Sequence, residues 1–339
     1  ALNVFSQGHK VAETYIFHED RNSFKNPSHI TNAIIDHQNT DIIKISKEYH
    51  IHNMSINNKP CMTIKDGSRL VFECWDALEG KSKYYFKNNI SYNDERRRGT
   101  GNPATGPIFI EGASPGDVLE VEIHEIRLSR NGYMQSMNKN QFIDNTDREY
   151  VYLEVEVIDD QMIYNGRKMP VRPMVGVMGT AGLIEMTTGE VWDNGGNLDT
   201  RIVYKGSKVL LPVFVEGALL AMGDCHATQG DGEVFGKGVE IGADVEVTVR
   251  VRKDLKINRP IVINPDRIAS IASDPNILNA KNQAINDMGR YLVNVYGFSS
   301  IDASALIGFY GDLRFCQVVN PQKTVRMEIK TKYIELFKK

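Results

Sequence analysis

The segment Gly242–Arg252, GADVEVTVRVR, carries the clearest structural signal in the chain. Its valines alternate with polar or charged residues and stand at Val245, Val247, Val249 and Val251. Because successive side chains of a strand point to opposite faces, this alternation predicts a β-strand with one buried and one polar face. The glycine that precedes the alternation predicts a turn that leads into the strand.

Similar patterns of a turn followed by a strand occur on both sides of this segment. Three further glycines open strand-like patterns: Gly67, Gly116 and Gly206. Near the C-terminus, alternate apolar residues in Val325–Ile329 predict another strand. After Gly116 the apolar series slips by one position at His124-Glu125, which predicts a β-bulge at that point.

One stretch of sequence occurs twice in similar form. Pro107–Ala113 reads PIFIEGA and Pro212–Ala218 reads PVFVEGA, and a Gly-Asp pair follows each copy. The echo predicts two related β units. Duplication of an ancestral unit and convergence on a common strand-and-turn pattern both explain it.

Helical patterns concentrate late in the chain. Asp274 and Pro275 supply an N-cap and a first-turn proline, and apolar residues then follow at helical spacing until Gly297. Ser299 and Asp302 resemble a capping box for a second, shorter helix.

These patterns predict a mainly β protein. Its body is expected to be an antiparallel β structure up to about residue 260, with a helical insertion before a final strand. We expect four segments: an N-terminal extension of unclear role (1–45), a first β unit (46–170), a second β unit that carries the site (171–260), and a helical insertion with a final strand (261–339).

Composition excludes several classes of function. Lys and Arg number 40 against 43 Asp and Glu, a net charge of −3 that argues against a nucleic-acid partner. Apolar runs such as Val209–Val215 fall far short of the roughly 18 residues that span a bilayer, so no membrane partner is expected. Four cysteines without a CxxC pair, and no signal-peptide pattern, predict thiols in a reducing, cytoplasmic compartment.

The densest chemical segment is Gly223–Glu233, GDCHATQGDGE. In Asp224-x-His226 a carboxylate and an imidazole project from one face of an extended segment, as two metal ligands can. The glycine-rich Trp192–Asp199 segment offers a further carboxylate and an amide. Such a mixed set suits Zn²⁺, or less specifically Mn²⁺ or Fe²⁺. The alternative is that both segments are turns rich in Asp and Asn whose acids face water.

Other reactive residues have simpler explanations. Cys225 is a candidate nucleophile beside an imidazole, but adjacent strand residues face opposite ways, so we favour a buried structural thiol. His50 and His52 form an isolated HxH, for which we favour a solvated or packing role over metal binding. Glu111 ends an echoed strand, where it is either a general base or a turn residue.

Several motifs, in order, resemble the acetamidase/formamidase family. They are Asn102–Pro107, Glu111–Ala113 with Pro115–Leu119, Gly195–Asp199, Leu211–Leu219, Gly223–Glu233, and Gly311–Arg314 with Val325–Glu328. The resemblance covers roughly residues 46 to 330. Cys225 departs from the family pattern, in which glycine is usual, and so does Thr228, where alanine is common.

The resemblance implies a cytoplasmic amidohydrolase that releases ammonia and a carboxylate from formamide or acetamide. It also implies a mainly β fold: a β-sandwich or barrel-like body with a smaller α+β part that includes C-terminal helices. It further implies a divalent metal, with Zn²⁺ our first choice, and a homo-oligomer (dimer or higher). By motif, the metal ligands are Asp199, Asp224 and His226. Glu233 is the expected proton-transfer residue and Glu111 a second catalytic candidate, while Gln229 and Asn197 are expected to orient the amide.

Two alternatives remain. One is hydrolysis of another non-peptide C–N bond, because family resemblance fixes the reaction type better than the substrate. The other is a catalytically silent β-sandwich that binds a ligand or a structural ion. An acid, a base and metal ligands in one loop favour an enzyme.

Overall fold

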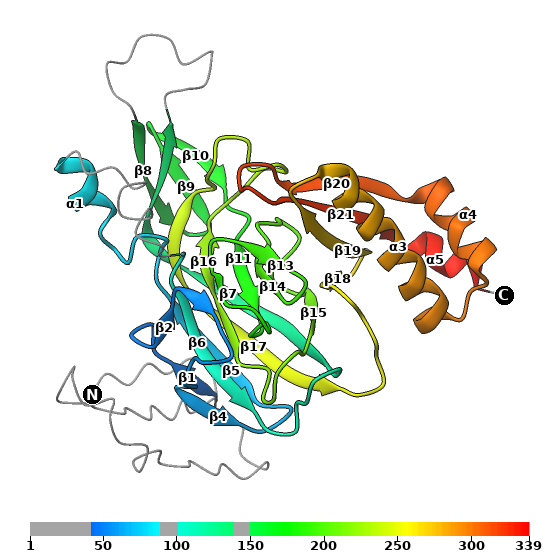
Figure 1. The fold of residues 1–339 in the computed structure, drawn as a ribbon. Helices are drawn as coiled ribbons and strands as arrows, with labels where there is room; N and C mark the ends of the chain where they lie inside the picture. Colours follow the sequence, from blue (N-terminus) through cyan, green and yellow to red (C-terminus); the bar gives the residue numbers. More distant parts are fainter. Residues whose placement is uncertain (1–41, 89–100, 138–149, 339) are drawn as a thin grey trace.

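The computed structural model describes residues 42–88, 101–137 and 150–338, and strands dominate it. One large, curled, mainly antiparallel sheet forms the body, and helices α3, α4 and α5 pack together at the C-terminal side (Figure 1). The predicted fold class is therefore confirmed.

The element bounds in the described residues are as follows. The first strands are β1 (Ile43–Ile45), β2 (His50–Ile51), β3 (Asn53–Met54), β4 (Met62–Ile64), β5 (Arg69–Cys74), β6 (Ala104–Ile110), β7 (Val118–Met137), β8 (Tyr150–Ile158), β9 (Gln161–Tyr164) and β10 (Arg167–Pro170). The later strands are β11 (Met174–Gly179), β12 (Met186–Thr187), β13 (Val191–Trp192), β14 (Gly195–Asn197), β15 (Lys208–Pro212), β16 (Leu220–His226), β17 (Glu240–Arg252), β18 (Ile261–Ile263), β19 (Arg267–Asp274), β20 (Asp312–Gln317) and β21 (Lys323–Lys330). The helices are α1 (Ser82–Lys87), α3 (Ile277–Tyr296), α4 (Ser300–Tyr310) and α5 (Thr331–Phe337).

Strand β17 contains the alternating valines and lies between β5 and β7 in the sheet. Val245, Val247 and Val249 are fully buried in the main core, as predicted. Burial of each such side chain contributes roughly 1.5–3 kcal/mol. These three residues therefore anchor the middle of the body.

The predicted bulge is confirmed at its predicted position. On β17, Glu246 opposes Glu125 of β7, whereas the next residue, Val247, opposes Ile123. His124 is therefore the extra residue on β7, and its insertion restores the apolar face after the slip in parity.

The C-terminal lobe forms a second core. Helix α3 packs on β19 and β21, and its buried side chains join those of α4 and both strands. Gly297 ends α3 in the left-handed region at φ 73°, and the Ser299 side chain caps α4 through the Asp302 N–H, as predicted. The N-cap of α3 is Asn276 rather than Asp274, because Asp274 Oδ1 accepts a hydrogen bond from the Asn276 N–H and shapes the preceding turn.

The C-terminal segment contains one more strand than predicted. The expected single final strand is a pair, β20 and β21, followed by helix α5. Of the expected extension 1–45, only residues 42–45 lie within the described residues, and there β1 pairs in parallel with β5. The divisions at residues 170 and 260 remain predictions, although β17 pairs with both β5 and β7 across the first of them.

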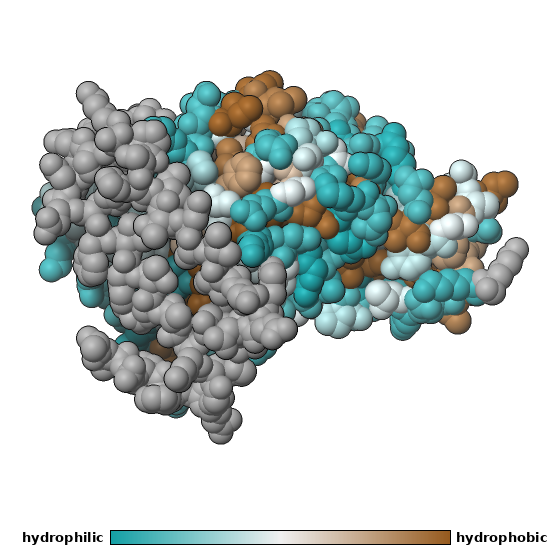
Figure 2. Space-filling model, turned by 90° about the horizontal axis from the view of Figure 1, so that it is seen from below, coloured by the Kyte–Doolittle hydropathy of each residue, from teal (hydrophilic) through white to brown (hydrophobic). Residues whose placement is uncertain are grey.

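Where the described residues are visible from below, the surface is mostly polar, with apolar patches at the top of the view and on the C-terminal lobe at the right (Figure 2). Exposed apolar side chains on the lobe include Ile301, Phe309 and Leu336. Within the described ranges, no helix combines the length and apolar character needed to cross a membrane.

Candidate active site

Pairing among four strands gathers the predicted site residues. Strand β11 lies between β14 and β16, so that Val177 opposes both Asn197 and Gly223. On its other side, β16 meets the first residue of β17, where His226 opposes Glu240. Because paired strands lie about 4.8 Å apart, residues near these strand ends come close together.

Five ionisable side chains form a buried cluster at this place: Asp199, Asp224, His226, Glu233 and Glu240. Each is at most 5 % exposed. They form two overlapping triads, each with one ligand atom per residue within 4.8 Å of the others, and both triads include His226. Its Nε2 lies 3.3 Å from Glu240 Oε2 and 3.7 Å from Asp224 Oδ1. The structure therefore brings together Asp199, Asp224, His226 and Glu233.

The backbone at three of these residues adopts an unusual conformation. Asp199, Asp224 and Glu233 have φ values of 39°, 55° and 45°, in the left-handed region that L-residues seldom adopt. Such conformations cost of order 1–3 kcal/mol each and cluster at functional sites. The three carboxylates therefore reach the cluster at an energetic cost that the surrounding structure must offset.

Gly176 leaves the space that two of these carboxylates need. A Cβ at this position would lie 2.7 Å from Asp199 Oδ1 and 3.1 Å from Asp224 Oδ2. Any larger residue would push the two side chains apart. The Gly176–Gly182 segment matches no nucleotide motif, and its first glycine instead lines this site.

Gln229 fixes the orientation of His226. Its Nε2 donates to the Asp199 carbonyl at 2.7 Å, and its Oε1 lies 2.7 Å from His226 Nδ1. Because a carbonyl can only accept, the amide must turn its oxygen to the imidazole, and Nδ1 must donate. This hydrogen bond leaves Nε2 facing the acids. Gln229 is thus a positioning residue rather than the predicted substrate contact, since both ends of its amide are already engaged.

Two asparagines border the cluster. The Asn102 amide donates to Asp224 Oδ2, and it also lies 3.5 Å from Asn197 Oδ1. Both asparagines are buried. Asn197 therefore lies at the edge of the cluster, where it was predicted to orient a substrate.

Burial and the charges of neighbouring groups change the pKa values of three side chains in the cluster. Burial alone would lower the pKa of His226, but Glu240 and Asp224 raise it well above its ordinary value. Burial, assisted by Glu233 and Asp224, raises the pKa of Asp199 well above its ordinary value. Burial also raises the pKa of Glu233 to about 7, against the opposing charge of His226.

The donor set fits a divalent cation. Asp199 Oδ1 and Glu233 Oε2 are buried and have no hydrogen-bond partner among the described residues. Buried acids need a counter-charge or hydrogen bonds, and Lys237 supplies one cation, 3.2 Å from Glu240 Oε1. Carboxylate oxygens with one imidazole nitrogen are ligands that Zn²⁺ accepts. The residues present therefore suit the ion that the motifs imply.

Two other candidates lie apart from the cluster. Glu111 is exposed in the turn after β6, whereas Ala104, at the other end of β6, opposes Gly223 beside the cluster. Seven strand residues separate Glu111 from Ala104 by about 23 Å. The structure therefore does not support a catalytic role for Glu111. Cys225 is fully buried in the main core, and the neighbouring Cys74 thiol and burial raise its pKa well above the ordinary value.

Sequence reasoning missed Glu240 and Asn102. Glu240 lies beyond the Gly223–Glu233 segment, and only the pairing of β16 with β17 places it opposite His226. Asn102 opens the first motif that resembles the family, which was the available signal, but no role followed from its spacing. In the structure, the Asn102 amide donates a hydrogen bond to Asp224, so Asn102 has a role in positioning that carboxylate.

Arg326 of β21 holds the loop that carries Glu233. Its guanidinium is 1 % exposed and makes a bidentate pair with Asp231 at 2.8 and 2.9 Å. It also bonds Glu328 Oε2 at 3.0 Å and the Phe315 carbonyl at 2.9 Å. Asp231 is two residues before Glu233, so the C-terminal lobe fixes the site loop.

We expect Arg326→Met to lower the free energy of unfolding by about 3 kcal/mol, because Glu328 and Asp231 lose a buried counter-charge. The loss should stay at the low end for a buried pair, since Arg267 still pairs with Glu328 and Arg201 with Asp231, each at 3.0 Å. Arg326→Lys keeps the charge but loses the planar fork, so its loss should be smaller. Urea denaturation followed by circular dichroism measures both.

Arg314→Met is the matched control. Arg314 lies on the adjacent β20, but it is half exposed, and its distance of 3.6 Å from Glu328 is longer than that of Arg326. It should change stability by no more than about 1 kcal/mol. An Arg326→Met variant as stable as the Arg314 control would contradict the proposed anchor.

Comparison with known proteins identifies relatives of this chain. The model of the Acetamidase/Formamidase family matches residues 40–190 and 186–319. The crystal structure of a recombinant predicted acetamidase/formamidase from Thermoanaerobacter tengcongensis is 34% identical, with a TM-score of 0.79 over 87% of this chain and 97% of that one. An acetamidase from Bacillus halodurans is 33% identical, with a TM-score of 0.78 over 87% and 99%.

A curated relative is more distant. The acetamidase of Mycolicibacterium smegmatis is 26% identical over 278 residues, which are 60% of this chain and 66% of the relative. The chain belongs to the acetamidase/formamidase family, and so to the amidohydrolases that act on short amides.

Proposed function

We propose that this protein is a metal-dependent hydrolase of short aliphatic amides, with formamide and acetamide as its substrates. The observation that carries the proposal is the buried cluster in which Asp199 Oδ1 and Glu233 Oε2 have no hydrogen-bond partner within the part of the chain that the structure describes. A set of acids around one oriented imidazole is costly to bury without a cation.

Asp199, Asp224 and His226 are the residues that would hold the ion, for which we propose Zn²⁺. When bound, such an ion lowers the pKa of a water molecule and polarises the amide carbonyl. The hydrogen bond from Nδ1 to Gln229 keeps Nε2 of His226 turned to the acids, and the Asn102 amide fixes Asp224. These contacts set the ligand directions in advance.

Glu233 is the proposed proton-transfer residue. Burial raises the pKa of its carboxyl group above the ordinary value, and a positioned carboxyl group can accept a proton and release it again. It would take the proton of the attacking water and give it to the departing nitrogen. Asn197, at the edge of the cluster, would orient the substrate amide by hydrogen bonds.

Ammonia release from formamide, acetamide and propionamide tests this function. We expect release to fall at least about tenfold after chelation and to return when Zn²⁺ is restored, with metal content measured on the same samples. Full activity in metal-free protein would refute the metal. Bound metal without ammonia from any of the three amides would favour a different C–N bond or a binding role.

We also propose a cytoplasmic homo-oligomer. All four cysteines are free thiols, which supports a reducing compartment. Exposed Ile301, Phe309 and Leu336 on the C-terminal lobe support self-association. Light scattering coupled to size-exclusion chromatography measures the assembled mass, and a monomer would refute the oligomer.

A further inference from the structure

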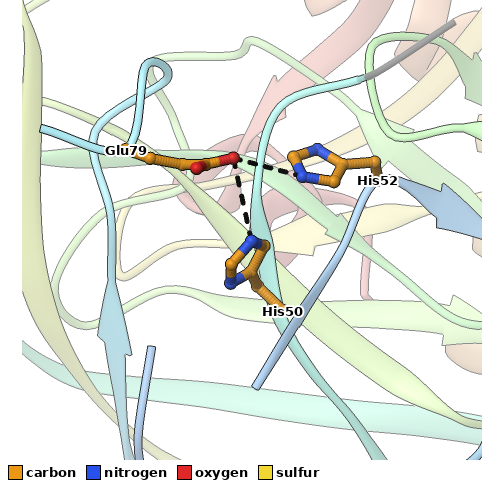
Figure 3. A group of neighbouring side chains, drawn as sticks. All are labelled: His50, His52 and Glu79. Atoms are coloured by element: carbon orange, nitrogen blue, oxygen red, sulfur yellow. Dashed lines mark ion pairs between the residues drawn. The ribbon is translucent and has the colours of Figure 1, made fainter. Parts of the chain in front are cut away.

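A second group of metal-binding side chains lies outside the buried cluster. His50 of β2, His52 between β2 and β3, and Glu79 in the loop after β5 turn toward one another (Figure 3). Their side chains are 22 %, 31 % and 26 % exposed, so solvent reaches them. The HxH pattern alone indicated packing or solvation; the fold adds a carboxylate from a distant loop.

Backbone carbonyls fix both imidazoles in the same way. His50 Nδ1 lies 2.8 Å from the Lys47 carbonyl, and His52 Nδ1 lies 2.9 Å from the Gly101 carbonyl. A carbonyl can only accept a hydrogen bond, so each Nδ1 must be the donor. In the neutral rings Nε2 therefore carries the lone pair. Metal-binding histidines almost always donate their other ring N–H in this manner.

The spacing of the ligand atoms suits a tetrahedral ion. Glu79 Oε1 lies 3.2 Å from His52 Nε2 and 3.8 Å from His50 Nε2. A zinc ion with ligand bonds of about 2.0–2.1 Å separates its ligand atoms by about 3.3–3.4 Å. Both distances from Glu79 are within about half an ångström of this value, and the three ligand atoms lie within 4.8 Å of one another.

The surroundings of Glu79 keep its carboxylate in place. Lys81 Nζ donates to Oε2 at 2.6 Å and leaves Oε1 turned to the histidines. Asp76 Oδ1 accepts hydrogen bonds from the N–H groups of Leu78 and Gly80, which hold the loop on either side of Glu79.

We propose that His50, His52 and Glu79 form a second Zn²⁺ site, separate from the buried cluster. Two imidazole nitrogens and one carboxylate oxygen fill three positions of a tetrahedral zinc and leave one for water. The ion would tie β2 to the loop after β5. It would also hold the backbone at Gly101, next to Asn102 of the active site.

Zinc titration of the full chain tests the proposal without any measurement of turnover. We expect wild-type protein to bind one more tight Zn²⁺ per chain than His52→Gln, as measured by competition with a chromophoric chelator. Glu79→Gln should weaken that second equivalent at least about tenfold. Because the buried cluster is unchanged in both variants, the first equivalent should remain.

His124→Gln is the matched control. It also removes one part-buried imidazole, and His124 bonds Thr248 Oγ1 at 2.7 Å rather than a carboxylate. It should bind as much zinc as wild type, and thermal melts of each variant should report an intact fold. Equal zinc content in wild type, His52→Gln and Glu79→Gln would overturn the site.

The position of the ion gives an independent readout. In crystals soaked with ZnCl₂, an anomalous difference peak should lie within bonding distance of both Nε2 atoms, and it should be absent from His52→Gln. A peak confined to the buried cluster would refute the second site but support the proposed function. The two proposals can therefore fail separately.

Discussion

Asp199→Asn should lower kcat/KM for acetamide by at least about 10³-fold, which makes it one of the two largest effects we expect. The amide has the same shape as the carboxylate but lacks its charge. In residues 42–88, 101–137 and 150–338, Oδ1 of Asp199 has no hydrogen-bond partner that would explain its burial. The variant should also lose bound metal. Ammonia release and metal content, measured together, test both expectations.

Asp193→Asn is the matched control for this variant. Asp193 lies six residues earlier, is about half exposed, and pairs with Arg259 Nε at 2.9 Å. The same chemical change there should leave kcat/KM within about twofold. Wild-type activity and metal content in Asp199→Asn would remove Asp199 from the proposed ligands.

Glu233→Gln should lower kcat by about 10²–10⁴-fold while metal remains bound, because proton transfer by a positioned side chain contributes that much. KM should change little, since the proposed substrate contact is Asn197. Steady-state kinetics with formamide and acetamide, with metal analysis of the same sample, separate the two parameters.

Glu111→Gln is the control for Glu233→Gln. Glu111 ends an echoed strand motif but lies exposed, away from the cluster, so its variant should stay within about twofold of wild type. If Glu233→Gln lost its metal together with its activity, Glu233 would be a ligand rather than the proton-transfer residue. The triad of Asp199, His226 and Glu233 makes this outcome a real alternative.

Local patterns were enough to predict most of the fold. The valines of β17 and the bulge at His124 follow from the two-residue period of a strand, which depends only on neighbours in sequence. The Ser299 cap of α4 likewise depends on contacts within one turn. The start of α3 was misplaced because Asp274 and Asn276 both suit a cap, and only the backbone geometry distinguishes them.

The site was only partly predictable, for a physical reason. Asp224, His226 and Glu233 lie in one segment, so their types and spacing already indicated a site. Glu240 joins the site because β17 pairs with β16. Asn102 joins it through a hydrogen bond to Asp224, 122 positions away in sequence. Neither contact depends on local spacing. The role of Gln229 also required the structure, because sequence does not reveal which ends of an amide are already bonded.

The anchor between Arg326 and Asp231 spans 95 positions of the chain. The loop that carries Glu233 is synthesised before Arg326, the arginine that holds it, which lies near the C-terminus on β21. Because chains leave the ribosome from the N-terminus, a nascent chain has the four acids and the imidazole of the cluster well before it has this support. Catalytic competence should therefore arise late in synthesis, after β21 has docked.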